Sequence, residues 1–157
     1  MVNSLLAVAL LVGPGPVGGQ AKEAGPSPSP TLGPAQVIRA QLDALRLNDQ
    51  PSKDAGIAIA FRFASPRNQE ATGPLANFTQ ILRSPGYLPM LGHRIAGTGP
   101  LVIVNGVAIQ RVTVVAADGQ AYEYEFQLSK DPTSGCWFTD GVIPVPKAKP
   151  IDKGVLS

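Results

Sequence analysis

The sequence predicts one small α+β domain, Pro34 to Val145, in which a few helices precede an antiparallel sheet. Two observations predict this class. Apolar residues recur at helical spacing in the first half of the domain, and after Tyr87 the pattern becomes that of extended strands. Helices that come first and strands that follow indicate helices packed on one sheet face, because a doubly wound fold would alternate the two.

The first predicted helix begins at Pro34, whose fixed φ angle suits the first helical position. It ends at residues 48–51, Asn-Asp-Gln-Pro, because the residue before a proline disfavours the α conformation. Its apolar residues share one face: Val37, Ile38, Leu42 and Leu45.

Two further helices are predicted before the sheet. One runs from Asp54, a residue type that caps helix starts, to Ala64, and Ser65-Pro66 stops it. The other starts near Pro74. Its apolar residues again fall on one side: Leu75, Phe78 and Leu82.

The sheet begins with a strong hairpin signal. Residues 101–104 and 107–116 are rich in β-branched residues, and Asn105-Gly106 between them tolerates the positive φ angles of a two-residue turn. A second turn at 117–120 leads to a strand that alternates aromatic and polar residues over 122–128. Such alternation predicts one buried and one wet face. A last strand covers 137–143.

The two ends of the chain differ from the domain in composition. Residues 1–24 hold an apolar run that is short for a membrane span, followed by Gly and Pro and by small residues, as in an export or organelle-targeting segment. No Lys or Arg precedes that run, so an N-terminus without a targeting role is the alternative. Residues 25–33 read as a Pro/Ser/Gly linker with too little apolar surface to pack, and residues 146–157 as a flexible tail.

Composition excludes several classes of partner and cofactor site. The net charge is +2 and the arginines are spread along the chain, so nucleic acid is not an expected partner. Cys136 is the single cysteine, which leaves no intrachain disulfide and no multi-cysteine zinc site. It is expected to be a small buried hydrophobic residue rather than a reactive thiol. We expect no metal, no cofactor and no stable membrane span.

Several segments together resemble a known family. They are, in order, Ala35 to Leu45 with Asn48-Asp49, Phe63 to Pro66, Thr72 to Leu75 with Phe78, Gln110 to Val112 before Asp118-Gly119, and Cys136-Trp137 in a strand ending at Val142. Over most of the domain the chain resembles a small uncharacterised family of the nuclear transport factor two-like superfamily. It looks closest to members from plants and algae, with bacterial relatives further off.

This resemblance implies a cone fold, with helices wrapped against a curved sheet whose concave face makes a pocket. The cone hosts isomerases, dehydratases, transport adaptors and inactive subunits, so it does not imply one function. The likeness to plant members suggests a plastid protein that is targeted through the N-terminal apolar segment; an exported or periplasmic protein is the alternative.

Two hypotheses about function follow. The leading one is a non-enzymatic module that binds an apolar small molecule or a protein partner on the concave sheet face, around Tyr124, Phe126 and Trp137, with His93 nearby. A homodimer contact on the open sheet is a further use of such a surface.

The alternative hypothesis is a cofactor-independent lyase or isomerase. It would use His93, the single histidine, with Tyr87 or Asp140 as the acid and base. However, His93 lies in a loop before the sheet, where an ordinary surface histidine is expected, and the sequence shows no partner for it.

Overall fold

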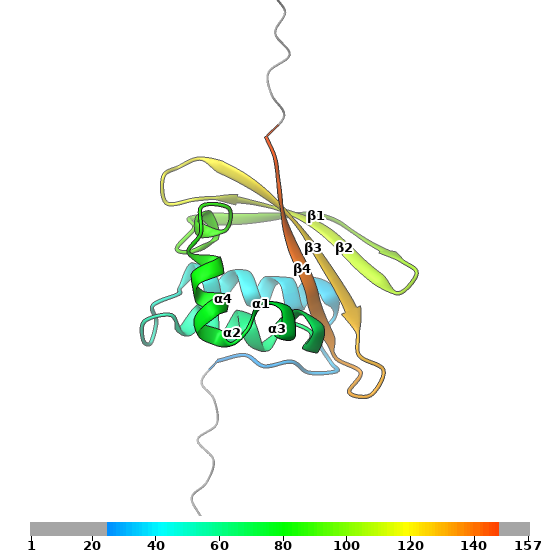
Figure 1. Cartoon of the computed structure of the whole chain (residues 1–157). Coiled ribbons are helices and arrows are strands. Elements are labelled where there is room, and N and C mark those ends of the chain that lie inside the picture. The colour runs from blue at the N-terminus through cyan, green and yellow to red at the C-terminus, as the bar shows by residue number, and fades with distance from the viewer. Residues whose placement is uncertain (1–24, 148–157) are drawn as a thin grey trace, which may run out of the picture.

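The computed structural model describes residues 25–147 of the chain. In this part, four α-helices and a short 3-10 helix precede four strands (Figure 1). The predicted fold class is confirmed: the helices pack against a curved antiparallel sheet that does not close into a barrel. The targeting segment predicted for residues 1–24 and most of the predicted tail, 148–157, lie outside the described residues.

Helix α1 spans Pro34–Arg46 and begins where the proline predicted it. The backbone N–H of Gly33 donates to the Gln36 side chain over 2.8 Å, which satisfies one of the free donors at the helix start. The predicted apolar face is confirmed, because the buried residues of α1 are Val37, Ile38, Gln41, Leu42 and Leu45.

Helix α2 spans Ala55–Arg62, but Asp54 does not cap it as predicted. Asp54 has a positive φ of 61°, and its side chain makes no cap hydrogen bond. Asn48 from the end of the α1 segment takes that role, because its Oδ1 accepts from the backbone N–H of Ile57 over 3.0 Å. The cap therefore comes from outside the helix's own sequence.

A short helix that the sequence does not predict, α3, spans Pro66–Thr72. Ser65 accepts a hydrogen bond from the Asn68 N–H over 3.2 Å, so the serine predicted to stop the second helix caps α3 instead, and α2 ends earlier, at Arg62. No residue of α3 is buried, so it lacks the apolar periodicity that reveals a helix. The predicted third helix follows as α4, Leu75–Leu82, and the 3-10 helix η1, Leu88–Met90, leads into the sheet.

The sheet is an antiparallel meander in which each strand pairs with the next along the chain. Its strands are β1 Ile95–Val104, β2 Val107–Val115, β3 Ala121–Lys130 and β4 Trp137–Val145. The predicted hairpin turn is confirmed: Asn105 has a φ of 50° and Gly106 a φ of 79°. The register shifts between Thr98 and Leu101, where β1 carries an irregularity.

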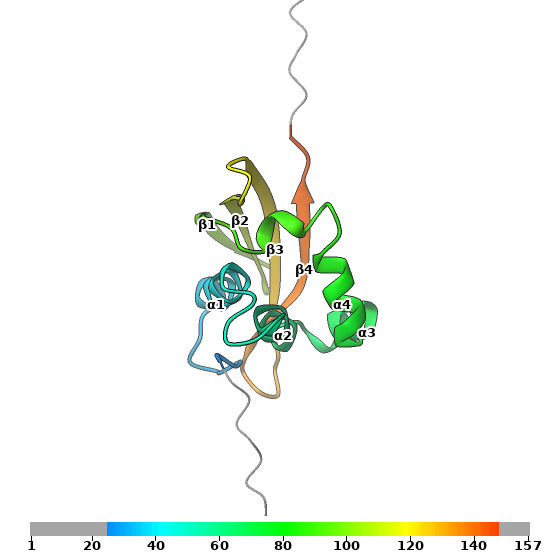
Figure 2. The same ribbon diagram turned by 90° about the vertical axis from the view of Figure 1, so that its left-hand side faces the viewer.

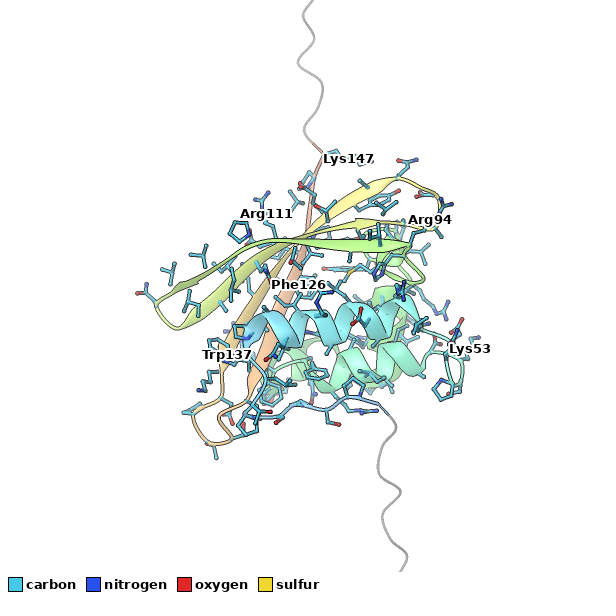
Figure 3. The ribbon with its side chains drawn as sticks, turned by 180° about the vertical axis from the view of Figure 1, so that it is seen from behind. Lys53, Arg94, Arg111, Phe126, Trp137 and Lys147 are labelled. Atoms are coloured by element: carbon cyan, nitrogen blue, oxygen red, sulfur yellow. The ribbon has the colours of Figure 1, made fainter. Side chains whose placement is uncertain are left out.

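The two faces of the sheet have different surroundings. The inner face carries the buried residues of β2 and β3, and α1 packs against it with the other helices arranged beside it (Figure 2). Figure 3 shows Phe126 between the sheet and α1, and Arg111 on the opposite, outer face. The predicted alternation of β3 is confirmed, because Tyr124, Phe126 and Leu128 are buried.

The segment 25–33, predicted to be a linker that does not pack, lies against the domain. Leu32 packs against the hydrophobic core. The Arg62 guanidinium donates to the carbonyl of Pro26 over 3.2 Å and to the Ser27 hydroxyl over 3.3 Å. One leucine and the two hydrogen bonds from Arg62 hold this segment against the domain, although its composition is typical of a linker.

Thr139 of β4 joins the helices to the sheet. Its hydroxyl accepts a hydrogen bond from the Gln41 side chain over 2.7 Å. Its backbone N–H donates to Phe63 over 2.7 Å, and its carbonyl accepts from the Ser65 N–H over 2.9 Å and from the Asn68 side chain over 3.0 Å. Thr139 is 2% exposed, so these bonds are made away from water. They connect α1, the α2–α3 junction and β4.

We predict that Gly56→Ala destabilises the domain. An added Cβ at Gly56 would lie 2.0 Å from the carbonyl oxygen of Ala44 in α1, so the two helix backbones would have to separate. Overpacking of this kind costs about 1–3 kcal/mol or more. The measurement is the free energy of unfolding in urea. Gly97→Ala is the control, because an added Cβ there meets open space. Equal losses in the two variants would contradict the close helix contact.

We also predict that Gln41 and Thr139 are energetically coupled. Thr139→Val leaves the Gln41 amide without its short hydrogen bond and is expected to cost about 1–3 kcal/mol, because a buried donor loses its partner. Replacing both residues, with Gln41→Leu as the second change, should cost less than the sum of the single changes. Urea unfolding of the four proteins measures the coupling, and strictly additive costs would argue against it.

Candidate functional site

The residues predicted to bind a ligand on the inner sheet face lie in the hydrophobic core. Tyr124 and Phe126 are each 1% exposed, and Trp137 is half-buried against the same core cluster. Apolar side chains of α1 belong to that cluster as well. None of these three aromatic residues lines the cavities beside His93, Leu88 or Asp140. Helix packing thus occupies the place where the resemblance implied a pocket.

The hydroxyls of Tyr124 and Tyr87 have structural partners. Tyr124 donates to the carbonyl of Gly86 and Tyr87 to the carbonyl of Val142, each over 2.9 Å. Their rings stack with a centroid distance of 6.4 Å. Burial raises the pKa of both phenols above the ordinary value, that of Tyr124 to about 12. These groups tie the loop before the sheet to β3 and β4.

The acid–base pair of the lyase hypothesis is not assembled. The hydroxyl of Tyr87 is engaged with a β4 carbonyl. Asp140 is exposed and lines a hollow between α3 and the outer sheet face, beside Arg67 and Gln127. His93 lines a different cavity, between α1 and β1. The structure therefore places the three candidates in separate surroundings.

His93 is buried, not exposed as predicted. Its side chain is 3% exposed, and its Nδ1 atom lies 2.8 Å from the carbonyl oxygen of Met90. The neighbouring backbone is held on both sides: the N–H of Gly92 donates to Leu45 in α1 over 3.0 Å, and the N–H of Arg94 donates to Val115 in β2 over 2.8 Å. These tertiary bonds draw the loop inward, which the local sequence does not reveal.

A cleft with a volume of about 170 Å³ lies beside His93, between α1 and the start of β1. Charged residues from two segments surround it: Arg39, Asp43 and Arg46 on α1, and Arg94 next to His93. The remaining lining residues are Leu42, Ile95, Ala96 and Thr98. The cleft thus combines guanidinium groups, an imidazole and a hydroxyl, which are groups that bind oxyanions.

A second, more apolar hollow of about 450 Å³ lies between the η1 region and the β2–β3 turn. Its lining includes Leu88, Pro89, Leu91, Ala116 and Tyr122. This size lies within the range of small-molecule sites. An apolar small molecule fits this hollow, because most of the side chains that line it are apolar.

The outer sheet face carries exposed apolar residues on both sides of a polar strip. Val102 and Val104 of β1 are 51% and 52% exposed, and Ile143 of β4 is 49% exposed. Between them, on β2 and β3, Arg111 and Glu125 are direct cross-strand neighbours whose side chains approach to 3.7 Å. An open sheet face with flanking apolar bands is a surface of the kind that binds other proteins.

Residues 25–147 contain neither a metal-ligand cluster nor a helix suited to crossing a membrane. In this range no three His, Cys, Asp or Glu side chains come together as a metal site. None of the helices there has the length and hydropathy of a transmembrane segment. Cys136 is free and buried, as predicted from its position.

A protein-family model described as a domain of unknown function, DUF4864, matches residues 33–151. The chain belongs to the DUF4864 family. No curated protein and no solved structure gives a significant match. The match spans every helix and strand of this DUF4864 domain. The family description names no activity.

The cleft of the DUF4864 domain was not predicted from the sequence. Arg39, Asp43 and Arg46 follow each other at helical spacing on α1, so the sequence places them on one exposed side. That signal shows a charged helix face and nothing more. The approach of Arg94 and His93 to this face depends on the folded loop, which brings together residues about fifty positions apart.

We predict that the DUF4864 domain loses stability as the pH rises above about 10, and that Tyr124 is a main cause. The unfolded phenol ionises near pH 10, whereas the folded one ionises at about 12. Between these values the unfolded chain gives up a proton that the folded chain retains, so stability falls with rising pH.

In Tyr124→Phe this fall should be shallower, and the phenolate absorbance step of highest pH should disappear. Urea unfolding at several pH values and an alkaline absorbance titration measure the two effects. Tyr122→Phe is the control, because Tyr122 is only partly buried and that variant keeps the Tyr124 step. The same slope in the wild type and in Tyr124→Phe would contradict the prediction.

Proposed function

We propose that this domain is a non-enzymatic binding module of the nuclear transport factor two-like superfamily, and that it binds a second copy of this chain through the outer face of its sheet. The arrangement of helices first and a curved, open meander afterwards supports the superfamily, as does the resemblance in sequence. A plastid location is part of the same proposal and rests on that resemblance alone.

The exposed apolar surface of the β1 region carries the proposal. Large exposed hydrophobic residues gather there: five of the nine that residues 25–147 show lie on β1. They are Ile95, Leu101, Val102, Ile103 and Val104. Of these, Ile95, Val102 and Val104 lie on the outer face, whereas Leu101 and Ile103 pair with the buried inner-face residues Gln110 and Ala108. β1 is also an edge strand, so its outer backbone groups have no strand neighbour within the described sheet. Apolar bands of this kind on a small domain indicate a protein contact.

A second copy is the occupant that the charges favour. Arg111 and Glu125 lie side by side in the polar strip of the outer face, with the flanking apolar bands on β1 and β4. A two-fold axis through this strip would place Arg111 against the partner's Glu125, and Glu125 against the partner's Arg111. Such a surface is complementary to itself, because each charge meets its opposite.

The other hypotheses have weaker support. An apolar small molecule has a suitable hollow beside Leu88 and Tyr122, so binding of such a molecule is the second candidate function. A lyase or isomerase needs an acid and a base that face one substrate, and His93, Tyr87 and Asp140 lie in separate surroundings.

We predict that charge reversal on the outer face controls self-association. Arg111→Glu would bring two carboxylates together across the two-fold axis, and Glu125→Arg two guanidiniums. Each single change should weaken the dimer about tenfold or more, whereas the double variant with both changes should restore it, since opposite charges face each other again. Sedimentation velocity over a concentration series measures the dimer dissociation constant.

Lys53→Glu is the matched control, because Lys53 lies in the loop before α2, away from the outer face (Figure 3). It changes the net charge as Arg111→Glu does and should leave association unchanged. A chain that stays monomeric at high micromolar concentration would overturn the proposed partner. So would single variants that associate like the wild type.

A further inference from the structure

The cleft between α1 and β1 is lined by more positive than negative charge. Arg39 and Arg46 reach it from α1 and Arg94 from the loop before β1, whereas Asp43 is its one carboxylate; β1 contributes no charged lining residue. Across residues 25–147, no hydrogen bond or ion pair engages the side chain of Arg39 or Arg46. Like charges around a small cleft repel one another, and a bound anion removes that cost.

The loop that carries Arg94 is fixed in place. One terminal nitrogen of Arg94 donates to the carbonyl of Ala117 over 2.7 Å, and its backbone N–H donates to Val115 over 2.8 Å. These bonds fix the position of Arg94, whose charge also acts on Asp118 in the β2–β3 turn. Its remaining guanidinium N–H groups make no further hydrogen bond within residues 25–147. A tethered arginine on one side and two unpaired arginines on the helix opposite form an arrangement that is prepared for an anion.

His93 provides a polar group at the base of this cleft. It is 97% buried, because its exposed fraction is 3%, and its ring is among the lining residues. The Met90 carbonyl can only accept, so the Nδ1 atom beside it carries the proton and donates. The Nε2 atom has no hydrogen-bond partner in the described part of the chain.

Nε2 is also not sealed off from the cleft. Within residues 25–147, Oε1 of Gln110 is the only side-chain nitrogen or oxygen atom that is fully enclosed and lacks a hydrogen-bond partner. Nε2 of His93 is not among them although it too lacks a partner, so it reaches accessible space. A buried side chain that lines the cleft and has an accessible, unpartnered nitrogen is an observation separate from the arginines, and it points to a ligand.

We propose that this cleft binds a phosphate-sized oxyanion, either as the free ion or as the phosphate group of a small molecule. Its volume of about 170 Å³ corresponds to roughly five water molecules, which suits such a group. Three arginines approach from two segments, and a tetrahedral oxyanion has enough oxygen atoms to accept from all three and to place a fourth oxygen beside the imidazole. A carboxylate has only two oxygen atoms and cannot accept from all three arginines in this way. This site is independent of the proposed self-association.

The fixed tautomer of His93 makes binding proton-dependent. With the proton on Nδ1, a neutral imidazole presents a lone pair at Nε2, which repels an anionic oxygen. When the free imidazole is neutral, an oxyanion without a proton, such as sulfate, therefore binds together with one proton that goes to Nε2. Hydrogen phosphate carries an O–H that donates to Nε2 instead, so its binding needs no uptake. The other charged residues that face the site are Arg39, Asp43, Arg46 and Arg94. Their charges act on a bound sulfate and on a bound phosphate alike.

Calorimetric titration of the full chain with sodium sulfate and with inorganic phosphate at low ionic strength tests the proposal. The expected result is saturable binding of both anions. For sulfate, repeating the titration in two buffers of different ionisation enthalpy, at a pH where the free imidazole is neutral, should show uptake of about one proton, and His93→Gln should abolish that uptake. Arg39→Gln and Arg46→Gln should each weaken binding about tenfold or more, because a charge-assisted hydrogen bond is lost.

Lys53→Gln is the matched control, because it removes the same charge outside the cleft and should leave affinity unchanged. The arginine variants change exposed side chains, so they keep the test valid even if the buried His93 variant fails to fold. Glycerol phosphate distinguishes the two sources of the anion: tighter binding than inorganic phosphate supports a phosphorylated small molecule, and weaker binding supports the free ion. Absence of saturable binding at millimolar anion, or equal weakening by Lys53→Gln and Arg39→Gln, would overturn the site.

Discussion

The hydrogen bonds around Thr139 hold the helices on the sheet. Gln41 reaches Thr139 from α1, and Phe63, Ser65 and Asn68 reach its backbone from the α2–α3 junction. Because these groups are buried, each must find its partner inside the protein, and the set is satisfied only when the three elements meet in this arrangement. Apolar packing makes association of the helices and sheet favourable, and this polar junction selects one orientation for it.

This junction decides which surfaces of the domain stay open. The parallel bridge between Ala64 and Thr139 covers part of the β4 edge, whereas no such bridge or strand pairs with the outer edge of β1 in the described sheet. α1 is held over the inner face, where Tyr124 and Phe126 complete the core. Binding surfaces are left on the outer face and beside α1, where the loop holding His93 meets the helix.

The sequence predicts those elements whose cause is local. Pro34 marks the start of α1 because its ring presets φ for a helix. Asn105-Gly106 marks the hairpin because both residues adopt the positive φ that the turn requires. The alternation of β3 identifies its buried face because side chains on a strand point to opposite sides. These features, taken in order along the chain, lead to the α+β class and the meander without knowledge of any contact between distant residues.

The tertiary structure decides everything that depends on a partner far along the chain. Asn48 rather than Asp54 caps α2, and α3 forms without a buried residue because Ser65 and the β4 junction support it. His93 is buried since bonds to α1 and β2 pull its loop inward. The cationic cleft exists because that loop brings Arg94 toward the exposed side of α1. Local composition and periodicity determine the elements, whereas burial and the meeting of charges depend on how the elements pack, which no short stretch of sequence contains.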